Sequence, residues 1–179
     1  MKIINIFKPL WLVLAIFVLA ACAPTTGTEQ AAPEQPEATS SGSIMVASSP
    51  AHDWGDINIQ GGNVSHVFEL KNDGTSPLYL NGAQTSCMCT TAVYTLADGS
   101  ISPQYGMHNN SGLWTGEVAP GESFMVNVVF DPMAHGPDAV GPIQRSIRLM
   151  TSAQNAPVLE LTAGGNVLYE EEFNEKNES

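Results

Sequence analysis

Residues 124–130 read FMVNVVF, and this run ends at Asp131-Pro132. Every second side chain from Phe124 to Phe130 is large and apolar, which is the period of a half-buried β-strand. Proline has no amide hydrogen for a ladder, so it marks the end of the strand. The stretch therefore predicts a strand that places one face in a hydrophobic core.

The same alternation recurs along the rest of the chain, separated by Gly, Pro, Asn and Asp and without a helical period. It is found at residues 64–70, 78–80, 143–149 and 158–161. Gly164-Gly165 before a last apolar run suggests a turn or a bulge. Seven or eight short strands over about 125 residues predict an all-β, immunoglobulin-like β-sandwich.

One long irregular loop interrupts this pattern. Residues 97–116 read ADGSISPQYGMHNNSGLWTG, in which four glycines and a proline prevent regular structure. A loop this long inside a compact domain is usually functional or disordered. The aromatic residues Tyr105 and Trp114 favour a packed loop, so we expect functional residues there.

The amino terminus predicts export and lipidation. Lys2 and Lys8 precede an uncharged apolar run that ends in LAAC at residues 19–22. This run is shorter than the roughly 20 apolar residues that span a membrane, and it fits a lipoprotein signal peptide over residues 1–21. We expect a diacylglyceryl group on Cys22, and a location in the cell envelope outside the cytoplasm. Ala23, rather than aspartate, favours outer-membrane sorting if there are two membranes.

The mature chain would be acidic and contain a single folded domain. It would keep four of the six basic residues and all 18 acidic ones, giving 4 − 18 = −14. Such a charge repels phosphate backbones, so nucleic acid is not an expected partner, and membrane attachment is left to the lipid. We predict a disordered tether at 22–43, because that stretch lacks large apolar residues. The domain then covers 44–169, followed by an acidic disordered tail at 170–179.

Several motifs together resemble the bacterial domain-of-unknown-function family 1573. They are HDWGDI (52–57), SHVFELKNDG (65–74), PLYL (77–80), SCMCTT (86–91), APGE (119–122) and VVFDP (128–132). The resemblance covers roughly residues 44–165 and implies an immunoglobulin-like sandwich in exported, often lipid-anchored proteins, with no established activity. Met88 stands where the common pattern has glycine.

Cys87 and Cys89 carry the most distinctive chemistry. In an extended strand their Cα atoms would be about 6.5–7 Å apart, at the upper edge of disulfide geometry. Three interpretations remain open: a structural disulfide or buried thiol pair, a soft-metal site, and a dithiol that exchanges disulfides.

The soft-metal interpretation draws on donors elsewhere in the chain. Met107 and His108 lie in the irregular loop, and His135 lies in the Gly- and Pro-rich segment 131–142. Thiolate, thioether and imidazole together favour copper, especially Cu(I); zinc would leave Met107 without a role. His52 and His66 belong to the family pattern, and we expect structural roles for them.

The leading hypothesis is a non-enzymatic, lipid-anchored domain that binds copper through Cys87, Cys89, Met107, His108 and His135. The chain has no Gly-x-Ser-x-Gly, His-Glu-x-x-His, phosphate-loop or dinucleotide motif, so we do not expect an enzyme. The alternative is a structural or interaction module of the envelope that has an unidentified envelope protein as its partner, and in which the cysteine pair is purely structural.

Overall fold

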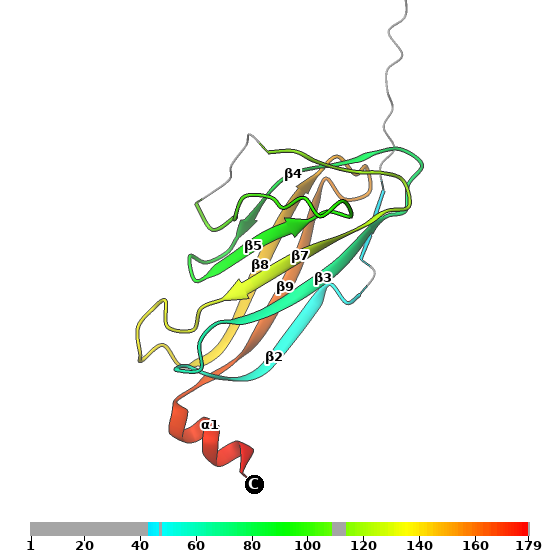
Figure 1. Cartoon of the computed structure of the whole chain (residues 1–179). Coiled ribbons are helices and arrows are strands. Elements are labelled where there is room, and N and C mark those ends of the chain that lie inside the picture. The colour runs from blue at the N-terminus through cyan, green and yellow to red at the C-terminus, as the bar shows by residue number, and fades with distance from the viewer. Residues whose placement is uncertain (1–42, 47, 109–113, 179) are drawn as a thin grey trace, which may run out of the picture. The chain divides into compact units, whose positions relative to one another are not determined.

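The computed structural model describes residues 43–46, 48–108 and 114–178, which form two β-sheets followed by one short helix (Figure 1). The strands are β1 (Ile44–Val46), β2 (Ala51–Asn58), β3 (Val64–Asn72), β4 (Leu78–Thr85), β5 (Thr90–Thr95), β6 (Gly116–Val118), β7 (Ser123–Phe130), β8 (Gly141–Thr151) and β9 (Val158–Leu168). The helix is α1 (Glu170–Asn177). This arrangement confirms the predicted immunoglobulin-like β-sandwich, with nine strands among the described residues.

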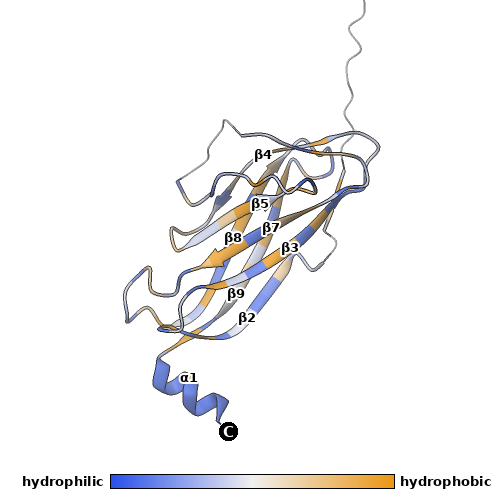
Figure 2. Cartoon of the chain, viewed as in Figure 1, coloured by the Kyte–Doolittle hydropathy of each residue, from blue (hydrophilic) through white to orange (hydrophobic). Residues whose placement is uncertain are grey.

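The first sheet has the order β1-β3-β7-β5, and all of its pairs are antiparallel. β7 lies inside this sheet, so its amide groups are paired on both edges. Phe124 lies opposite Leu70 of β3, and Phe130 lies opposite Thr90 of β5. The alternate residues of β7 that the sequence predicts to be inward are 0–2% exposed. In Figure 2 the ribbon of β7 is largely orange, because most residues on both of its faces are apolar.

The second sheet has the order β2-β9-β8-β4-β6 and contains one parallel pair, between β2 and β9. The register of this pair shifts between Asp53 and Asp56, around Gly55, whose φ is +69°. Gly164 and Gly165 lie within the continuous strand β9, so no turn separates two strands there. The irregularity is a bulge in the facing strand β2, and a Cβ at Gly165 would come within 2.8 Å of the Gly55 carbonyl oxygen.

Two hydrophobic clusters lie between the sheets. The larger contains the inward residues of both sheets and includes Tyr94 and Tyr105, each 0–1% exposed. The smaller cluster consists of Ile57, Ile59, Cys89, Phe130 and Val167, with Trp54, Val64, Cys87 and Ile143 packed against it. Cys89 therefore belongs to the smaller cluster, and Cys87 packs against it.

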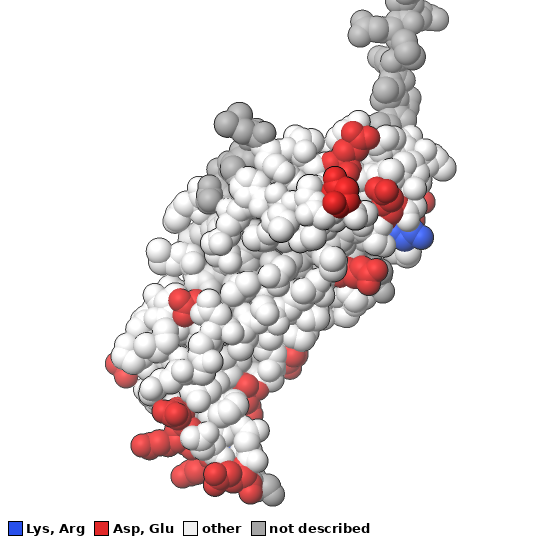
Figure 3. Space-filling model, in the orientation of Figure 1, with Lys and Arg blue, Asp and Glu red and all other residues white. Residues whose placement is uncertain are grey.

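Residues 170–177 form a helix where the sequence predicts a disordered tail, so that prediction is wrong for this segment. Glutamates occupy the first turn and Lys176 the last, which complements the helix dipole. Lys176 Nζ also lies 2.6 Å from Asp56 Oδ2 of β2. The hydrogen bond from Lys176 is the main reason that the pKa of Asp56 is lowered. Acidic side chains gather around α1 and again near the far end of the sandwich (Figure 3).

The predicted signal peptide (residues 1–21), Cys22 and nearly all of the predicted tether lie outside the described residues. The same holds for residues 109–113 of the irregular loop. In the parts of the chain that are described, no helix has the length and hydrophobicity needed to cross a bilayer.

Candidate functional site: the Cys87–Cys89 turn

Cys87 and Cys89 lie in a turn that connects β4 of one sheet to β5 of the other. The Thr90 amide donates to the Cys87 carbonyl oxygen at 3.2 Å, and the two cysteines are joined by a disulfide with their Cα atoms 5.3 Å apart. The pair therefore does not have the separation of about 6.5–7 Å that an extended strand would give. The chain must cross between sheets here, and the turn brings the Cα atoms into the usual range for a disulfide.

Backbone contacts fasten this turn to both sheets. Ser86 exchanges two hydrogen bonds with Ser146 of β8: its amide donates to the Ser146 carbonyl at 2.9 Å, and its Oγ accepts from the Ser146 amide at 3.0 Å. On the other side, the Asp131 amide donates to the Cys89 carbonyl at 2.9 Å. The turn thus joins β8 of one sheet to the end of β7 of the other.

The Thr85 hydroxyl closes the base of the turn. It lies 2.9 Å from the carbonyl oxygens of both Cys87 and Thr90, and Thr85 is buried. A hydroxyl has a single hydrogen, so the Thr85 hydroxyl donates to one of the two carbonyl oxygens at a time or shares its hydrogen between them. Threonine at this position therefore gives polar partners to a buried part of the backbone.

The two sulfur atoms have different surroundings. Cys89 is 3% exposed, and Arg145 Nε of β8 donates to its Sγ at 3.2 Å. The Arg145 guanidinium lies over the Phe130 ring, 5.4 Å from the centroid, and desolvation lowers its pKa. Cys87 is half-buried, and Nε2 of the exposed His135 lies 3.1 Å from its Sγ.

Cys87, Cys89 and His135 are the predicted ligands that the fold brings together. Their ligand atoms all lie within 4.8 Å of one another. His135 is 48 residues from Cys87 in sequence and reaches it from the segment that follows β7. Two thiols and one imidazole are a donor set for soft or borderline metal ions once the sulfurs are no longer bonded to each other.

Met107 and His108 are exposed, and His108 lies outside that group of three. The irregular loop instead doubles back along β5, where Tyr105 bridges Ala92 and Ile101 bridges Thr95. The Met107 carbonyl oxygen accepts a hydrogen bond from Gln84 at 3.2 Å. Tyr105 is buried and anchors the loop in the core. The structure therefore supports a packing role for this loop more directly than a ligand role for Met107 and His108.

Trp114 also packs into the protein core. Its ring stacks on Tyr94 with centroids 5.7 Å apart and planes within 9°. Trp114 is thus packed against the larger hydrophobic cluster, as expected for a packed loop.

Arg145 is the site residue that sequence reasoning did not identify. The alternation of β8 places it on the same side as Ile143 and Ile147, which was visible in the sequence. A charged residue on an apolar face usually has a polar or anionic partner. The position of Arg145 on an apolar face could therefore have predicted a polar partner nearby. That the partner is Cys89 depends on how β8 packs.

A second cluster joins the edge strand β2 to β3. His52 stacks on His66 with centroids 3.6 Å apart, and Trp54 contacts both His52 and Phe130 through ring contacts. Desolvation, and to a smaller extent His52, lowers the pKa of His66. These contacts agree with a structural role for the two histidines, through ring stacking.

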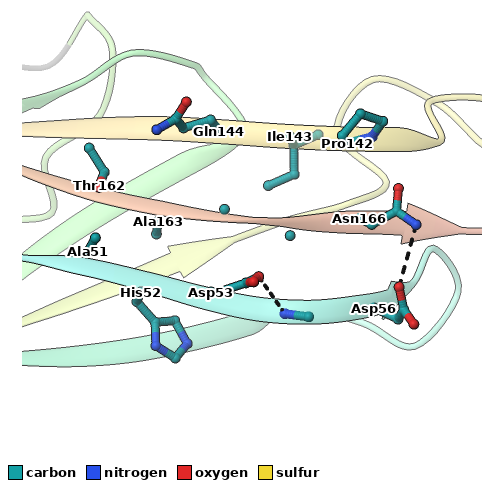
Figure 4. Close-up of a pocket in the computed structure, with 13 residues that line it drawn as sticks. Ala51, His52, Asp53, Asp56, Pro142, Ile143, Gln144, Thr162, Ala163 and Asn166 are labelled. Atoms are coloured by element: carbon teal, nitrogen blue, oxygen red, sulfur yellow. Dashed lines mark hydrogen bonds between the residues drawn. The ribbon is translucent and has the colours of Figure 1, made fainter. Parts of the chain in front are cut away.

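An open groove of about 570 Å³ lies on β2, β9 and β8 (Figure 4). Its floor is made by small residues, including Gly164 and Gly165. Its two carboxylates have local partners: Asp53 accepts from the Gly55 amide at 2.8 Å, and Asp56 accepts from Asn166 at 3.5 Å. The groove is therefore open and lined largely by small and apolar residues, and its two carboxylates are engaged by these local hydrogen bonds.

Comparison with known families agrees with the predicted resemblance. Residues 45–103 match the family described as "Protein of unknown function (DUF1573)". The matched segment includes both histidines of the stacked pair and both cysteines. It ends before His135 and Arg145, so it is shorter than the resemblance predicted from the motifs.

The fold is similar to that of one solved structure described first below, and two further structures match with lower scores. A protein of unknown function from Porphyromonas gingivalis W83 has a TM-score of 0.54 and 20% identity, over 74% of this chain and 51% of that one. The chain therefore spans about half the length of that protein. The ASH/PapD-like domain 7 of human CEP192 has a TM-score of 0.43 and 12% identity, over 82% and 99% of the two chains. The VesB protease of Vibrio cholerae has a TM-score of 0.42 and 19% identity, over 72% and 32%. No curated protein matches the chain.

Proposed function

We propose that this protein, whose residues 45–103 match the DUF1573 family, is a non-catalytic, lipid-anchored structural or interaction module of the cell envelope. The observation that carries the proposal is the Cys87–Cys89 disulfide, whose buried sulfur belongs to a hydrophobic cluster. Disulfides persist in oxidising compartments outside the cytoplasm. This chemistry agrees with the export signal and with acylation at Cys22.

The contacts of the turn support a structural role for the cysteine pair. Ser86 and Cys89 bind backbone groups of opposite sheets, and the disulfide joins two positions within the same connection. A covalent link here restricts the turn that holds the two layers together. The module would then present its sheet faces and loops to a partner in the envelope while the lipid holds it at the membrane.

Fatty-acid labelling tests the anchor. Cells that express the full chain are grown with a clickable fatty acid, and the label on the purified protein is compared with that on Cys22→Ser. We expect label on the natural chain and none on the variant. Equal labelling of the two proteins, or none on either, would contradict lipidation at Cys22.

Alkylation in intact cells tests the disulfide. A membrane-permeant maleimide is added before and after reduction, and the modified peptides are identified by mass spectrometry. We expect Cys87 and Cys89 to be modified only after reduction. Full modification without reduction would show that the pair is open in the cell, and the structural role would fail.

A further inference from the structure

We infer that the reduced Cys87–Cys89 pair and His135 form a three-coordinate Cu(I) site, and that the disulfide is the closed state of this site. The inference goes beyond the structural module proposed above, and it does not depend on the lipid anchor. Of the five ligands expected from the sequence it keeps Cys87, Cys89 and His135, because His135 is the imidazole that the fold places against the sulfurs, and it leaves out Met107 and His108.

The geometry of the three donors carries the proposal. Nε2 of His135 already lies 3.1 Å from Cys87 Sγ, and all three donor atoms fall within 4.8 Å. Metal–sulfur and metal–nitrogen bonds of about 2.0–2.3 Å place pairs of ligands on one ion roughly 3.5–4.5 Å apart. Opening the disulfide therefore needs only a small separation of the sulfurs to admit an ion.

The segment that carries His135 is held in a defined shape. The Met133 amide donates to Asp131 Oδ1 at 2.9 Å, and the Gly136 amide donates to the Met133 carbonyl at 2.9 Å. The Asp131 amide in turn binds the Cys89 carbonyl. The backbone that carries His135 is thus held beside the cysteine turn by hydrogen bonds that do not require the disulfide.

The charge balance favours a monovalent ion. Two thiolates and Cu(I) have a net charge of −1, whereas two thiolates and Zn²⁺ are neutral. Arg145, 3.2 Å from Cys89 Sγ, supplies one positive charge that offsets the net charge of the Cu(I) form. Beside a neutral zinc site the same guanidinium would have no charge to offset, and it would repel the incoming divalent ion. Soft thiolate ligands favour Cu(I) on chemical grounds as well.

The three proposed ligands differ in their exposure to solvent. Cys89 is buried in the smaller cluster, Cys87 is half-buried and His135 is exposed. The thioethers of Met88 and Met133, on the same two segments, are 67% and 42% exposed. They offer soft donors at the surface for ion transfer, while the buried end of the site keeps water from the bound ion.

Opening the site requires a two-electron reduction by a dithiol. One thiolate of the reductant attacks Cys87 Sγ, and Cys89 leaves as a thiolate beside Arg145. The second thiol of the reductant then displaces Cys87, which leaves an oxidised dithiol partner and two reduced cysteines. Binding of Cu(I) displaces the remaining thiol protons to water, and no further electrons are transferred.

Competition for Cu(I) tests the proposal on the full chain in detergent. All samples carry Cys22→Ser, so that Cys87 and Cys89 are the remaining thiols among the three cysteines. Protein that has been reduced and desalted without oxygen is titrated into the coloured bicinchoninate–Cu(I) complex. We expect the reduced chain to withdraw one Cu(I) per molecule and the oxidised chain to withdraw none.

Variants identify the ligands. Cys87→Ser or Cys89→Ser should abolish binding, and His135→Ala should weaken it about tenfold or more. His108→Ala is the matched control and should bind as the parent chain does. If Cys89→Ser fails to fold, as judged by circular dichroism, the comparison of reduced and oxidised parent chain and the His135→Ala result still decide the matter.

Three outcomes would overturn the inference. They are a reduced chain that takes up no Cu(I), a loss of affinity in His108→Ala but not in His135→Ala, and Zn²⁺ that displaces Cu(I) at equal concentration. A chain that exchanges disulfides with a dithiol but binds no Cu(I) belongs to the first outcome. None of these results bears on fatty-acid labelling at Cys22, so failure of this inference is distinguishable from failure of the proposed module.

Discussion

The imidazole of His52 on β2 lies flat against the imidazole of His66 on β3, with ring centroids 3.6 Å apart and planes 6° from parallel. The two strands belong to different sheets, so this pair is a contact between the layers of the sandwich. Protonating both rings would place two positive charges face to face. The contact is therefore stable only while at least one ring is neutral.

This pair makes the stability of the domain dependent on pH. The pKa of His66 is below its ordinary value of 6.5, chiefly through desolvation. The unfolded chain therefore binds the proton more readily, so the stabilisation is complete above pH 6.5 and is lost as pH falls through the lowered pKa. We expect the melting temperature to fall between pH 7.5 and pH 5, and to fall less in His66→Phe, which keeps a ring in the stack.

The exposed His108 supplies the control for that experiment. His108→Ala should retain the pH dependence of the natural chain. Asp56 and Asp98 have pKa values below 3.8, so their contributions are lost only in more acidic solution. An unchanged pH slope in His66→Phe would show that other groups cause the effect.

Reducing the Cys87–Cys89 disulfide should lower the free energy of unfolding by about 1–2 kcal/mol, because the loop that it closes is short. Urea unfolding with and without a phosphine reductant measures this difference. The double variant Cys87→Ser/Cys89→Ser should not respond to the reductant. An equal response of the double variant would assign the effect to something other than this disulfide.

Removing the Tyr94 hydroxyl should cost about 1–2 kcal/mol. Tyr94 of β5 is buried, and its hydroxyl donates to the Gly82 carbonyl oxygen of β4 at 2.8 Å, which joins the two sheets. Desolvation raises the pKa of Tyr94 far above its ordinary value of 10, so the proton needed for this bond is retained in alkaline solution. Denaturant unfolding of Tyr94→Phe measures the cost. Tyr169→Phe, at an exposed position, should change stability by less than about 0.5 kcal/mol, and equal costs would contradict the role of this bond.

Gly165→Ala should destabilise the domain by about 1–3 kcal/mol, which is the usual cost of overpacking. The added Cβ would lie 2.8 Å from the Gly55 carbonyl oxygen and 2.9 Å from Ile57 Cδ1. Gly106→Ala is the matched control, since its nearest neighbour would be the Thr90 carbonyl oxygen at 4.0 Å. Thermal unfolding of both variants distinguishes the bulge contact from a general effect of replacing glycine.

The candidate site could be predicted only in part. Cys87 and Cys89 are apparent from spacing alone, because residues two apart are always close. Sequence spacing could not show whether His108 or His135 approaches the cysteines, since each lies in an irregular segment whose path depends on packing. Tyr105 enters the core and directs the loop before His108, whereas hydrogen bonds around Asp131 direct His135 to Cys87.

The strands and their inward faces follow from the sequence. Successive side chains of a β-strand point to opposite faces of the sheet, and the face that packs in the core must be apolar. Residues such as Phe124 and Val128 carry that information locally. The parallel pairing of β2 with β9, the disulfide turn between sheets and the contact of His135 with Cys87 were decided by the tertiary structure. They join segments that are distant in sequence or that change direction, and only the packing of the two sheets brings such groups together.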